Sequence, residues 1–477
     1  MSFNHHFRIS SVIRQKYLTV LVCVLIIGTN NAPAQDIFRA ACRGNVAVVD
    51  SLLQTTSLNI KDERERSLMH WAIGCRKDEM FDFLLRKGID INEEDQQGMT
   101  PMHVAIKFGN EFYFNALVNA QPNKDWIDTY DTSLLEQAVL VKNLVFLEKL
   151  LTLGAAINSV NQRGSTALEI AQRMELNEIT EFLLSKGADP SMVRSISVEG
   201  KYMGYRDTGN TPVILAPNFI STEEQEFGSV FNAAGTEFYF AVDVNGRNEI
   251  RFSRLTENRW TKPEVILSHE SYSYNDPFLS PDESRLYFIS NQPTDGVGDR
   301  KDIDIWYMER NDSGWSELIN AGPVINTSGN EYYISFTADW TMYFSTNGLA
   351  PGGSEKTDHD IYYSKFTDGV FQTPVALGES VNTKNYEADV FVAPDESYLI
   401  FVSTREDGFG RGDLYISFKK ANGKWSNALN MGDKINTHHY EYCPFVTRDG
   451  KYLLYTSNQD IYMMSTRIID ELKKTIR

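Results

Sequence analysis

Carboxylate side chains recur at one position of a repeated pattern in the C-terminal half of this 477-residue sequence. Glutamate stands at the start of four of five predicted strand repeats, and two aspartates follow two residues after a repeat start. Because alternate residues of a strand point to the same face, we expect all of these side chains on one side of the strands. The candidate ligand-binding residues are Glu226, Asp276, Glu331, Glu387, Asp389 and Glu441.

Several carboxylates gathered at one mouth indicate a site for a positive group. A hard cation such as Ca²⁺ favours oxygen ligands and tolerates irregular geometry. A ligand with a lysine or arginine group would serve equally well, and a solvated ring with a purely structural role is the alternative. Catalytic signatures are scarce, since the sequence has no G-x-S-x-G, H-E-x-x-H or P-loop motif and no cysteine pair with zinc spacing. We therefore nominate no catalytic residue.

The elements that position these carboxylates belong to a repeat of about 50 residues. The repeat starts are Glu226, Tyr274, Glu331, Glu387 and Glu441, which are 48, 57, 56 and 54 residues apart. The phrase F-L-S-P-D-E-S at 278–284 returns as F-V-A-P-D-E-S at 391–397. A complete copy shows four short alternating or β-branched segments, which is typical of a propeller blade. The pattern predicts five blades, and six are an alternative if residues 196–210 hold a distorted one.

The last copy has no fourth strand of its own. After the acid-Ile-Tyr segment at 460–462 the chain continues into a short charged helical pattern, 468–476. We therefore expect residues 212–220 to supply the missing strand, because this closure would remove an open sheet edge.

A second repeat, of 33 residues, occupies the N-terminal part of the chain. The phrase T-P-M-H-V-A at 100–105 has counterparts at 67–72, 133–138 and 166–171, and an earlier degenerate copy begins near Asp36. A second apolar helical pattern and a glycine turn follow the phrase. Serine or threonine would cap the first helix, and glycine would end the second. About five such helix pairs would form one stack.

Both repeats resemble known families. The 33-residue repeat with its T-P-x-H-x-A phrase resembles the ankyrin repeat over about 160 residues. Residues 200–465 resemble the exported bacterial WD-repeat-like propellers of the TolB type, which have S-P-D-G and D-I-Y signatures. The resemblances imply an all-α ankyrin-repeat solenoid followed by an all-β propeller. Propellers host many functions, so this likeness implies a fold and leaves the activity open.

Buried structural roles are expected for the histidines and cysteines of the helical repeat. His70 and His103 occupy the histidine position of the ankyrin phrase, where the ring usually bonds to backbone between repeats. Copies four and five have Glu136 and Glu169 there, so those junctions must be satisfied differently. Packed helices lie about 8–10 Å apart, which we take as beyond disulfide reach. We therefore expect Cys42, Cys75 and Cys443 to be free thiols.

The N-terminus predicts export. Residues 1–17 are basic, an eleven-residue apolar run follows at 18–28, and Ala32 and Ala34 form an A-x-A site. This pattern is typical of a signal peptide cleaved after Ala34, with an uncleaved anchor as the alternative. The predicted domains are a signal peptide (1–34), an ankyrin-repeat domain (35–194), a linker (195–211), a propeller (212–466) and a helical tail (467–477).

The net charge and the composition exclude some classes of function. Lys+Arg 46 against Asp+Glu 64 gives a net charge of −18, which argues against a nucleic-acid partner. After signal cleavage no further apolar segment of spanning length remains. We predict a non-enzymatic binding protein of the bacterial cell envelope, periplasmic or extracellular, with a protein partner or an envelope ligand. The alternatives are a propeller-based glycosidase or polysaccharide lyase and a TolB-like envelope assembly factor.

Overall fold

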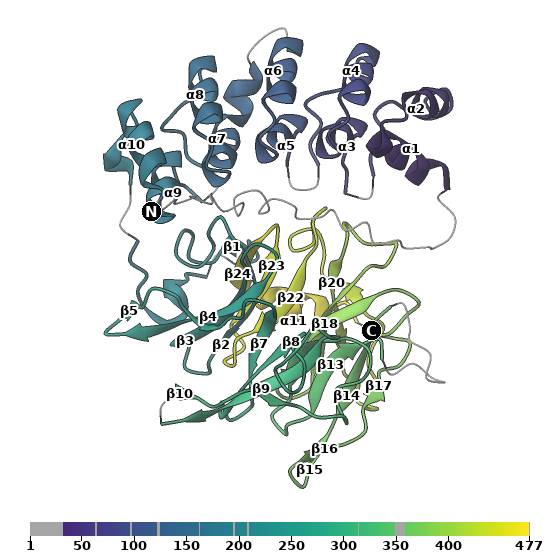
Figure 1. Ribbon diagram of the computed structural model, residues 1–477. Helices are drawn as coiled ribbons and strands as arrows, with labels where there is room; N and C mark the ends of the chain where they lie inside the picture. Colours follow the sequence, from purple (N-terminus) through teal and green to yellow (C-terminus); the bar gives the residue numbers. More distant parts are fainter. Residues whose placement is uncertain are drawn as a thin grey trace, which may run out of the picture. The chain divides into compact units, whose positions relative to one another are not determined.

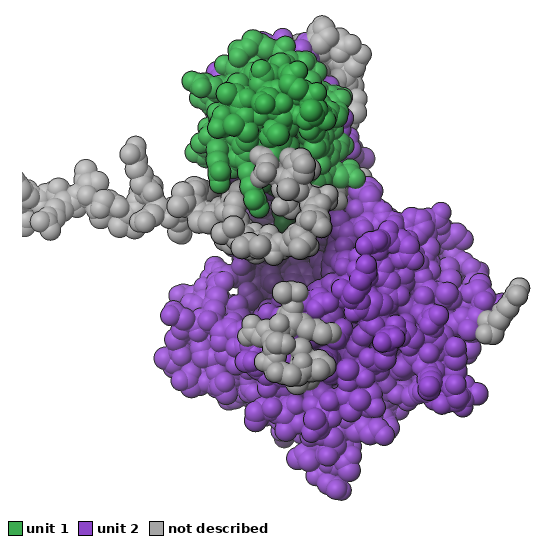
Figure 2. Space-filling view, turned by 90° about the vertical axis from the view of Figure 1, so that its right-hand side faces the viewer, with its two compact units in different colours: residues 1–90 green, residues 91–477 purple. Residues whose placement is uncertain are grey.

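The computed structural model describes residues 32–476 apart from 63, 96–97, 122–124, 162, 194–195, 208, 313 and 349–357. Residues 1–31 of the predicted signal peptide lie outside the described residues. The chain divides into two compact units, residues 1–90 and 91–477 (Figure 2). Among the helices of the described part, none has the length and apolar character needed to cross a bilayer.

Helix pairs form the N-terminal repeats (Figure 1). The first unit contains α1 (Ala32–Arg43), α2 (Val46–Leu52), α3 (Leu68–Gly74) and α4 (Asp78–Lys87). The second unit begins with α5 (Pro101–Lys107), α6 (Glu111–Ala120), α7 (Asp125–Leu140), α8 (Leu144–Leu153), α9 (Ala167–Arg173) and α10 (Asn177–Ser185). The predicted caps are present at Ser67, Thr100 and Thr166, and Gly88 and Gly154 end α4 and α8 in the left-handed conformation. The prediction of about five ankyrin-like helix pairs is confirmed.

The fourth repeat departs from the predicted cap. Ser133 lies inside α7 instead of before it. In repeats three and five, Gly98 and Gly164 turn the chain with positive φ two residues before the cap, and no glycine stands at that place before Ser133. The Ser133 hydroxyl instead lies 2.9 Å from Nε2 of His103, whose Nδ1 accepts the backbone N–H of Thr100. His103 therefore joins its own helix cap to the next repeat.

The prediction of a free thiol is wrong for two of the three cysteines. Cys42 and Cys75 form a disulfide with a Cα–Cα distance of 5.2 Å, whereas Cys443 is free and buried as predicted. The error lay in comparing an interaxial separation with a Cα–Cα limit. Each helix has a Cα radius of about 2.3 Å, so axes about 10 Å apart bring facing Cα atoms to about 5 Å.

Five antiparallel sheets form the blades within the described part of the second unit. Blade 1 contains β2 (Gln225–Phe231), β3 (Glu237–Asp243), β4 (Asn248–Thr256), β5 (Arg259–Trp260) and β6 (Glu264–Leu267). Blade 2 contains β7 (Tyr274–Leu279), β8 (Arg285–Ser290), β9 (Asp304–Asn311), β10 (Gly314–Trp315) and β11 (Ile319–Asn320). Blade 3 contains β12 (Glu331–Phe336), β13 (Met342–Thr346), β14 (Asp360–Ser364) and β17 (Val375–Ala376), with a hairpin of β15 (Phe366–Thr367) and β16 (Val370–Phe371). Blade 4 contains β18 (Glu387–Val392), β19 (Tyr398–Ser403), β20 (Asp413–Phe418) and β21 (Leu429–Asn430).

Blade 5 is completed from the other end of the propeller sequence. It contains β22 (Tyr442–Val446), β23 (Tyr452–Ser457) and β24 (Asp460–Ser465), and β1 (Val213–Ile214) pairs antiparallel with β24. The inner strands contact one another in the order β2, β7, β12, β18, β22, and β22 also contacts β2. The predicted closing strand and five-blade arrangement are therefore confirmed. Residues 201–204 form a turn beside blade 1, with Tyr202 and Met203 in the left-handed conformation, and add no sixth blade.

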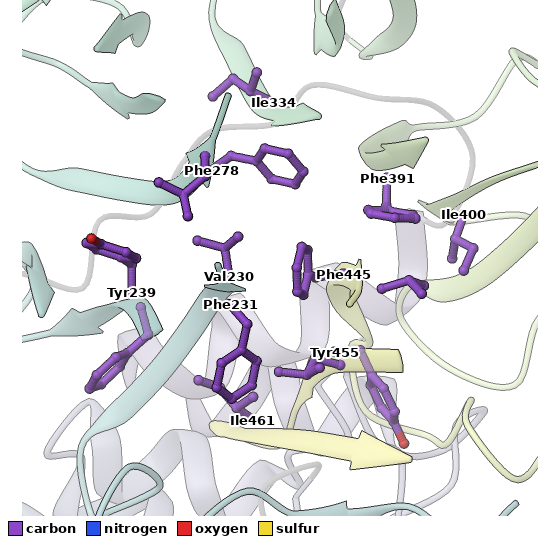
Figure 3. Close-up of a cluster of buried hydrophobic side chains, with 14 of the residues drawn as sticks. Val230, Phe231, Tyr239, Phe278, Ile334, Phe391, Ile400, Phe445, Tyr455 and Ile461 are labelled. Atoms are coloured by element: carbon purple, nitrogen blue, oxygen red, sulfur yellow. The ribbon is translucent and has the colours of Figure 1, made fainter. Parts of the chain in front are cut away.

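A core of aromatic and aliphatic side chains fills the centre of the ring. Phe278, Phe391 and Phe445 come from three different inner strands and face one another in Figure 3. The ring centroids of Phe278 and Phe391 each lie 5.9 Å from that of Phe445. The helix α11 (Arg467–Lys473) follows the last strand and buries Ile468 and Ile469. The inner strands are therefore held by packing at the axis as well as by hydrogen bonds within each blade.

The closing blade also contacts the last ankyrin repeats within the second unit. In blades 2 and 4 the acid at the start of the third strand, Asp304 or Asp413, accepts a 2.7 Å hydrogen bond from an asparagine of the fourth strand. In blade 5 the corresponding acid, Asp460, instead binds both Nε and Nη2 of Arg163, at 3.1 and 3.2 Å. Arg163 also lies 3.6 Å from Glu136, which confirms that this repeat junction is satisfied differently.

Four of the blade starts are fixed by one hydrogen-bonded unit, which we call the Glu–Thr clasp. In each, the carboxylate accepts the hydroxyl and the backbone N–H of a threonine four residues earlier. The pairs are Glu226 with Thr222, Glu331 with Thr327, Glu387 with Thr383, and Glu441 with Thr437. All four glutamates are fully buried. The clasp therefore ties the end of one blade to the inner strand of the next.

The clasp of blade 1 predicts a pH dependence of stability. Burial raises the pKa of Glu226 to about 8, above its ordinary value of 4.5. The folded state therefore favours the protonated acid, and this contribution is lost as the pH rises through the folded pKa. We expect the melting temperature to fall as the pH rises from about 4.5, the ordinary pKa, to about 8, the folded pKa, and Glu226→Gln, which cannot ionise, to flatten that fall. Thermal melts across this range test it; the exposed Glu317→Gln is the control, and equal slopes for both variants contradict the assignment.

Candidate functional site

A backbone irregularity recurs two residues after each blade start. Strand pairing is interrupted at this point in all five inner strands. The residue there has φ between 47° and 51° in every blade, which is the left-handed region. The five residues are Gly228, Asp276, Tyr333, Asp389 and Cys443. We call them the bulge ring; such bulges redirect side chains, and here the redirected residues gather around the propeller axis.

Three polar side chains of the bulge ring meet. The sulfur of Cys443 lies 3.5 Å from Oδ1 of Asp276 and 3.9 Å from Oδ2 of Asp389. A side chain at Gly228 would place its Cβ 2.6 Å from Oδ1 of Asp276, so glycine is required there. The Tyr333 hydroxyl donates to the carbonyl of Pro444 at 2.8 Å, from blade 3 to blade 5. The structure thus brings Asp276 and Asp389 together around Cys443.

The environment of these two carboxylates is buried and rich in phenols. Burial raises the pKa of Asp276, and the nearby charge of Asp389 raises it further. Burial also raises the pKa of Asp389, although hydrogen bonds from Cys443 oppose the shift. The electrostatic influence of the pair reaches Tyr332 and Tyr442, whose pKa values burial also raises. Burial therefore favours the neutral form of these carboxyl groups over two negative charges.

The four predicted glutamates lie elsewhere in the same strands. Glu226, Glu331, Glu387 and Glu441 are engaged in the Glu–Thr clasps, two residues before the bulge ring. Neighbouring hydroxyls add bonds, for example Ser403 to Glu387 at 2.8 Å and Ser457 to Glu441 at 2.7 Å. Their role in binding a ligand stays a prediction. No group of three potential metal ligands was found among the described residues, so we assign no Ca²⁺ site.

A cavity of about 310 Å³ opens at the start of the inner strands of blades 5 and 1. Its lining comes from three blades: Arg411 from blade 4, His439, Tyr440, Tyr442, Asn458 and Gln459 from blade 5, and Gln225 from blade 1. Two of the predicted carboxylates lie next to the cavity in the sequence, because Gln225 precedes Glu226, and Tyr440 and Tyr442 flank Glu441. None of these seven residues is among the carboxylates that the sequence predicts as ligand-binding residues.

Glycines allow the blade 4 loop to pack closely against the entrance of blade 5. A Cβ on Gly412 would lie 2.2 Å from the Tyr440 ring, and one on Gly410 would lie 2.2 Å from the carbonyl of Thr437. The backbone N–H of Arg411 donates to the carbonyl of His439 at 3.1 Å. The cavity wall is therefore a fitted junction between two blades, and the glycine-rich phrase of residues 408–412 is the sequence signal of that junction.

Known ankyrin-repeat proteins are similar in sequence to the helical repeats of this chain. A family model for ankyrin repeats, with three copies, matches residues 37–128. A putative ankyrin repeat protein of Acanthamoeba polyphaga mimivirus is 27% identical over 164 residues, 33% of this chain and 21% of that protein. Ankyrin repeat protein nuc-2 of Neurospora crassa is 28% identical over 178 residues, which are 36% of this chain and 16% of that protein. Rabankyrin-5 of Mus musculus is 28% identical over 171 residues, which are 30% of this chain and 15% of that protein.

These matches leave most of each relative uncovered. The chain spans about a fifth or less of the length of these curated relatives. The likeness therefore identifies a repeat type and leaves the activity of the whole protein open. The chain contains N-terminal ankyrin repeats, and an all-β region with a five-blade propeller arrangement follows them.

Proposed function

We propose that this protein is an exported binding protein that recognises a protein partner through its ankyrin repeats. Stacked helical repeats form extended surfaces suited to protein recognition. The observation that carries the proposal is a set of exposed apolar side chains on three adjacent repeats. A side chain kept out of the core at equivalent places in successive repeats is available to a partner.

We call this set the apolar stripe. Phe108 and Phe112 flank the turn between α5 and α6, Val145 follows the turn between α7 and α8, and Met174 ends α9. Their exposed fractions are 39%, 51%, 44% and 37%. Each lies where the first helix of a repeat passes to the second, so the same local geometry presents all of them. The proposed partner has apolar anchor residues that cover the stripe.

Two observations support export. The N-terminal basic, apolar and A-x-A segments have the order of a cleaved signal peptide. The Cys42–Cys75 disulfide suits an oxidising compartment, where such bonds persist. A periplasmic or extracellular location in a bacterial envelope is part of the proposal. We also propose that the propeller is of the TolB type, which its S-P-D and D-I-Y phrases support. The domain limits at residues 34, 194, 211 and 466 are proposed as well.

The apolar stripe predicts which surface the partner contacts. In Phe112→Ser combined with Val145→Ser, both substituted side chains are exposed and lie in the first turn of α6 and α8, so folding should be kept. We expect the affinity for the partner to fall by about tenfold or more, because two apolar anchors are lost. Affinity capture with the full chain, followed by titration of the captured protein, measures the change.

The control is matched in chemistry and exposure. Val265→Ser combined with Val375→Ser changes two propeller side chains that are each 49% exposed. This variant should capture and bind the partner as the unaltered chain does. Equal binding by the stripe variant, with an unaltered melting temperature, would remove the stripe from the proposed function.

Export predicts two features of the protein made in a Gram-negative host. The mature chain should begin at Gln35 after cleavage behind Ala34. Cys42 and Cys75 should resist alkylation until a reductant is added, because they are paired. Sequencing of the N-terminus and thiol labelling with and without a reductant test both. A chain that begins at Met1 in the cytoplasm with reactive Cys42 and Cys75 would rule out export.

A further inference from the structure

One turn recurs at the same place in each of the last three ankyrin repeats. It joins the first helix of a repeat to the second, in the pairs α5–α6, α7–α8 and α9–α10 (Figure 1). Its left-handed residue is Gly109, Lys142 or Glu175, with φ of 64°, 55° and 57°. Neighbouring packed helices lie about 8–10 Å apart, so equivalent turns of adjacent repeats are neighbours. The three turns therefore form one row along the apolar stripe.

The cap of the second helix presents two residues of the stripe in the same way. Phe112 and Val145 each stand two residues after a capping asparagine, Asn110 or Asn143. The cap accepts the backbone N–H of Phe112 at 3.1 Å and that of Val145 at 3.0 Å. Because the backbone is already fixed by these bonds, a partner that covers the two side chains pays little for ordering them.

Lysines accompany the stripe in repeats three and four. Lys107 ends α5, Lys142 precedes the cap of α8, and both side chains are exposed. The acids of α6 and α8 are paired with lysines of the following repeat: Glu111 with Lys149 at 2.7 Å and Glu148 with Lys186 at 2.9 Å. This part of the surface is therefore locally positive, although the whole chain has 64 acidic and 46 basic residues.

The charge reverses at the end of the row. In repeat five, Glu175 and Glu178 are exposed and follow Met174 of the stripe. Arg173, the basic residue of this turn, is held by Glu223. A partner that lies along the stripe therefore meets lysines at repeats three and four and glutamates at repeat five. Exposed charges act over about 10 Å at 0.1 M salt, which is about one repeat, so each end is felt separately.

We propose that the apolar stripe binds an acidic, amphipathic segment of the partner protein, with carboxylates of that segment beside Lys107 and Lys142. This partner rests on the proposed function, because it is assigned to the same surface. Apolar residues of the segment cover Phe112 and Val145, and its carboxylates pair with the lysines at the rim. A basic segment would set like charges against both lysines, which selects against it.

Three synthetic helical peptides test the charge of the segment. Each is about 18 residues long, which gives about 27 Å of helix and spans the three turns. All share leucines at every third or fourth position and differ only at the flanking positions, which hold glutamate, glutamine or lysine. Fluorescence anisotropy with the full chain measures each Kd at about 0.05 M and about 0.5 M NaCl. At low salt we expect the glutamate peptide to bind about tenfold or more tightly than the other two, and this advantage to shrink at high salt.

Charge reversal identifies the lysines. Lys107→Glu combined with Lys142→Glu should remove the preference for the glutamate peptide, because the local charge changes sign. The matched control, Lys262→Glu combined with Lys365→Glu, makes the same change in net charge at two exposed propeller lysines and should keep the preference. Melting temperatures without a peptide should match for all variants that are compared.

The variants separate the charge of the segment from the stripe itself. A glutamate peptide that fails to bind, or binds no more tightly than the glutamine or lysine peptide, overturns the acidic segment and leaves the stripe in place. An unaltered preference in a folded Lys107→Glu, Lys142→Glu variant overturns it as well. Binding of all three peptides that is unaffected by Phe112→Ser combined with Val145→Ser removes the stripe, and the proposed function with it.

Discussion

The pairing of β1 with β24 is the constraint on which the propeller depends. Without it, β24 would present a row of unpaired backbone groups at the edge of blade 5. Val213 and Ile214 pair with Met463 and Tyr462, and the backbone N–H of Leu215 donates to the carbonyl of Ile461 at 2.8 Å. The chain that leaves this strand then supplies Thr222, which clasps Glu226 of blade 1. Closure of the ring thus also fixes the first inner strand.

Closure also determines where the chemically interesting groups lie. The bulge ring needs all five inner strands at the same height, since Cys443 of blade 5 contacts Asp276 of blade 2 and Asp389 of blade 4. The cavity needs blade 5 beside blade 1, because Gln225 and Tyr442 bond across that junction. The contact of Arg163 with Asp460 joins the last ankyrin repeats to the same blade. The strand β24, which β1 pairs with, therefore carries the contact of blade 5 with the ankyrin repeats. The same blade lines the cavity.

The repeats made much of this architecture predictable from the sequence. The 33-residue phrase located the helix pairs, and the missing fourth strand after Asp460 indicated the closing strand. Side-chain destinations were harder to predict. A threonine stands four residues before each of Glu226, Glu331, Glu387 and Glu441, whereas position 270, four residues before Tyr274, is a glutamate. A threonine four residues before a glutamate therefore predicts the Glu–Thr clasp. This spacing predicts the hydrogen-bond partners of the four glutamates better than their shared position in the repeat does.

The other departures have physical causes of the same local kind. The cysteines pair because facing Cα atoms of packed helices lie closer than the helix axes do. Asp276 and Asp389 turn toward the axis because a left-handed residue interrupts each inner strand, which no alternation of polar and apolar residues predicts. Arg411 and Tyr440 come together only because Gly410 and Gly412 let two blades approach. These features depend on backbone geometry that becomes visible only once the blades are assembled.

Native-state hydrogen exchange at the backbone amide of Leu215 tests the closure most directly. This amide is the donor from the closing segment to β24, so its exchange reports whether the ring stays shut. The account predicts that Leu215 exchanges as slowly as amides of the central strand β23, such as Leu454. Exchange of Leu215 at the rate of an exposed loop amide such as Val297, while Leu454 remains protected, would contradict closure of the propeller by β1.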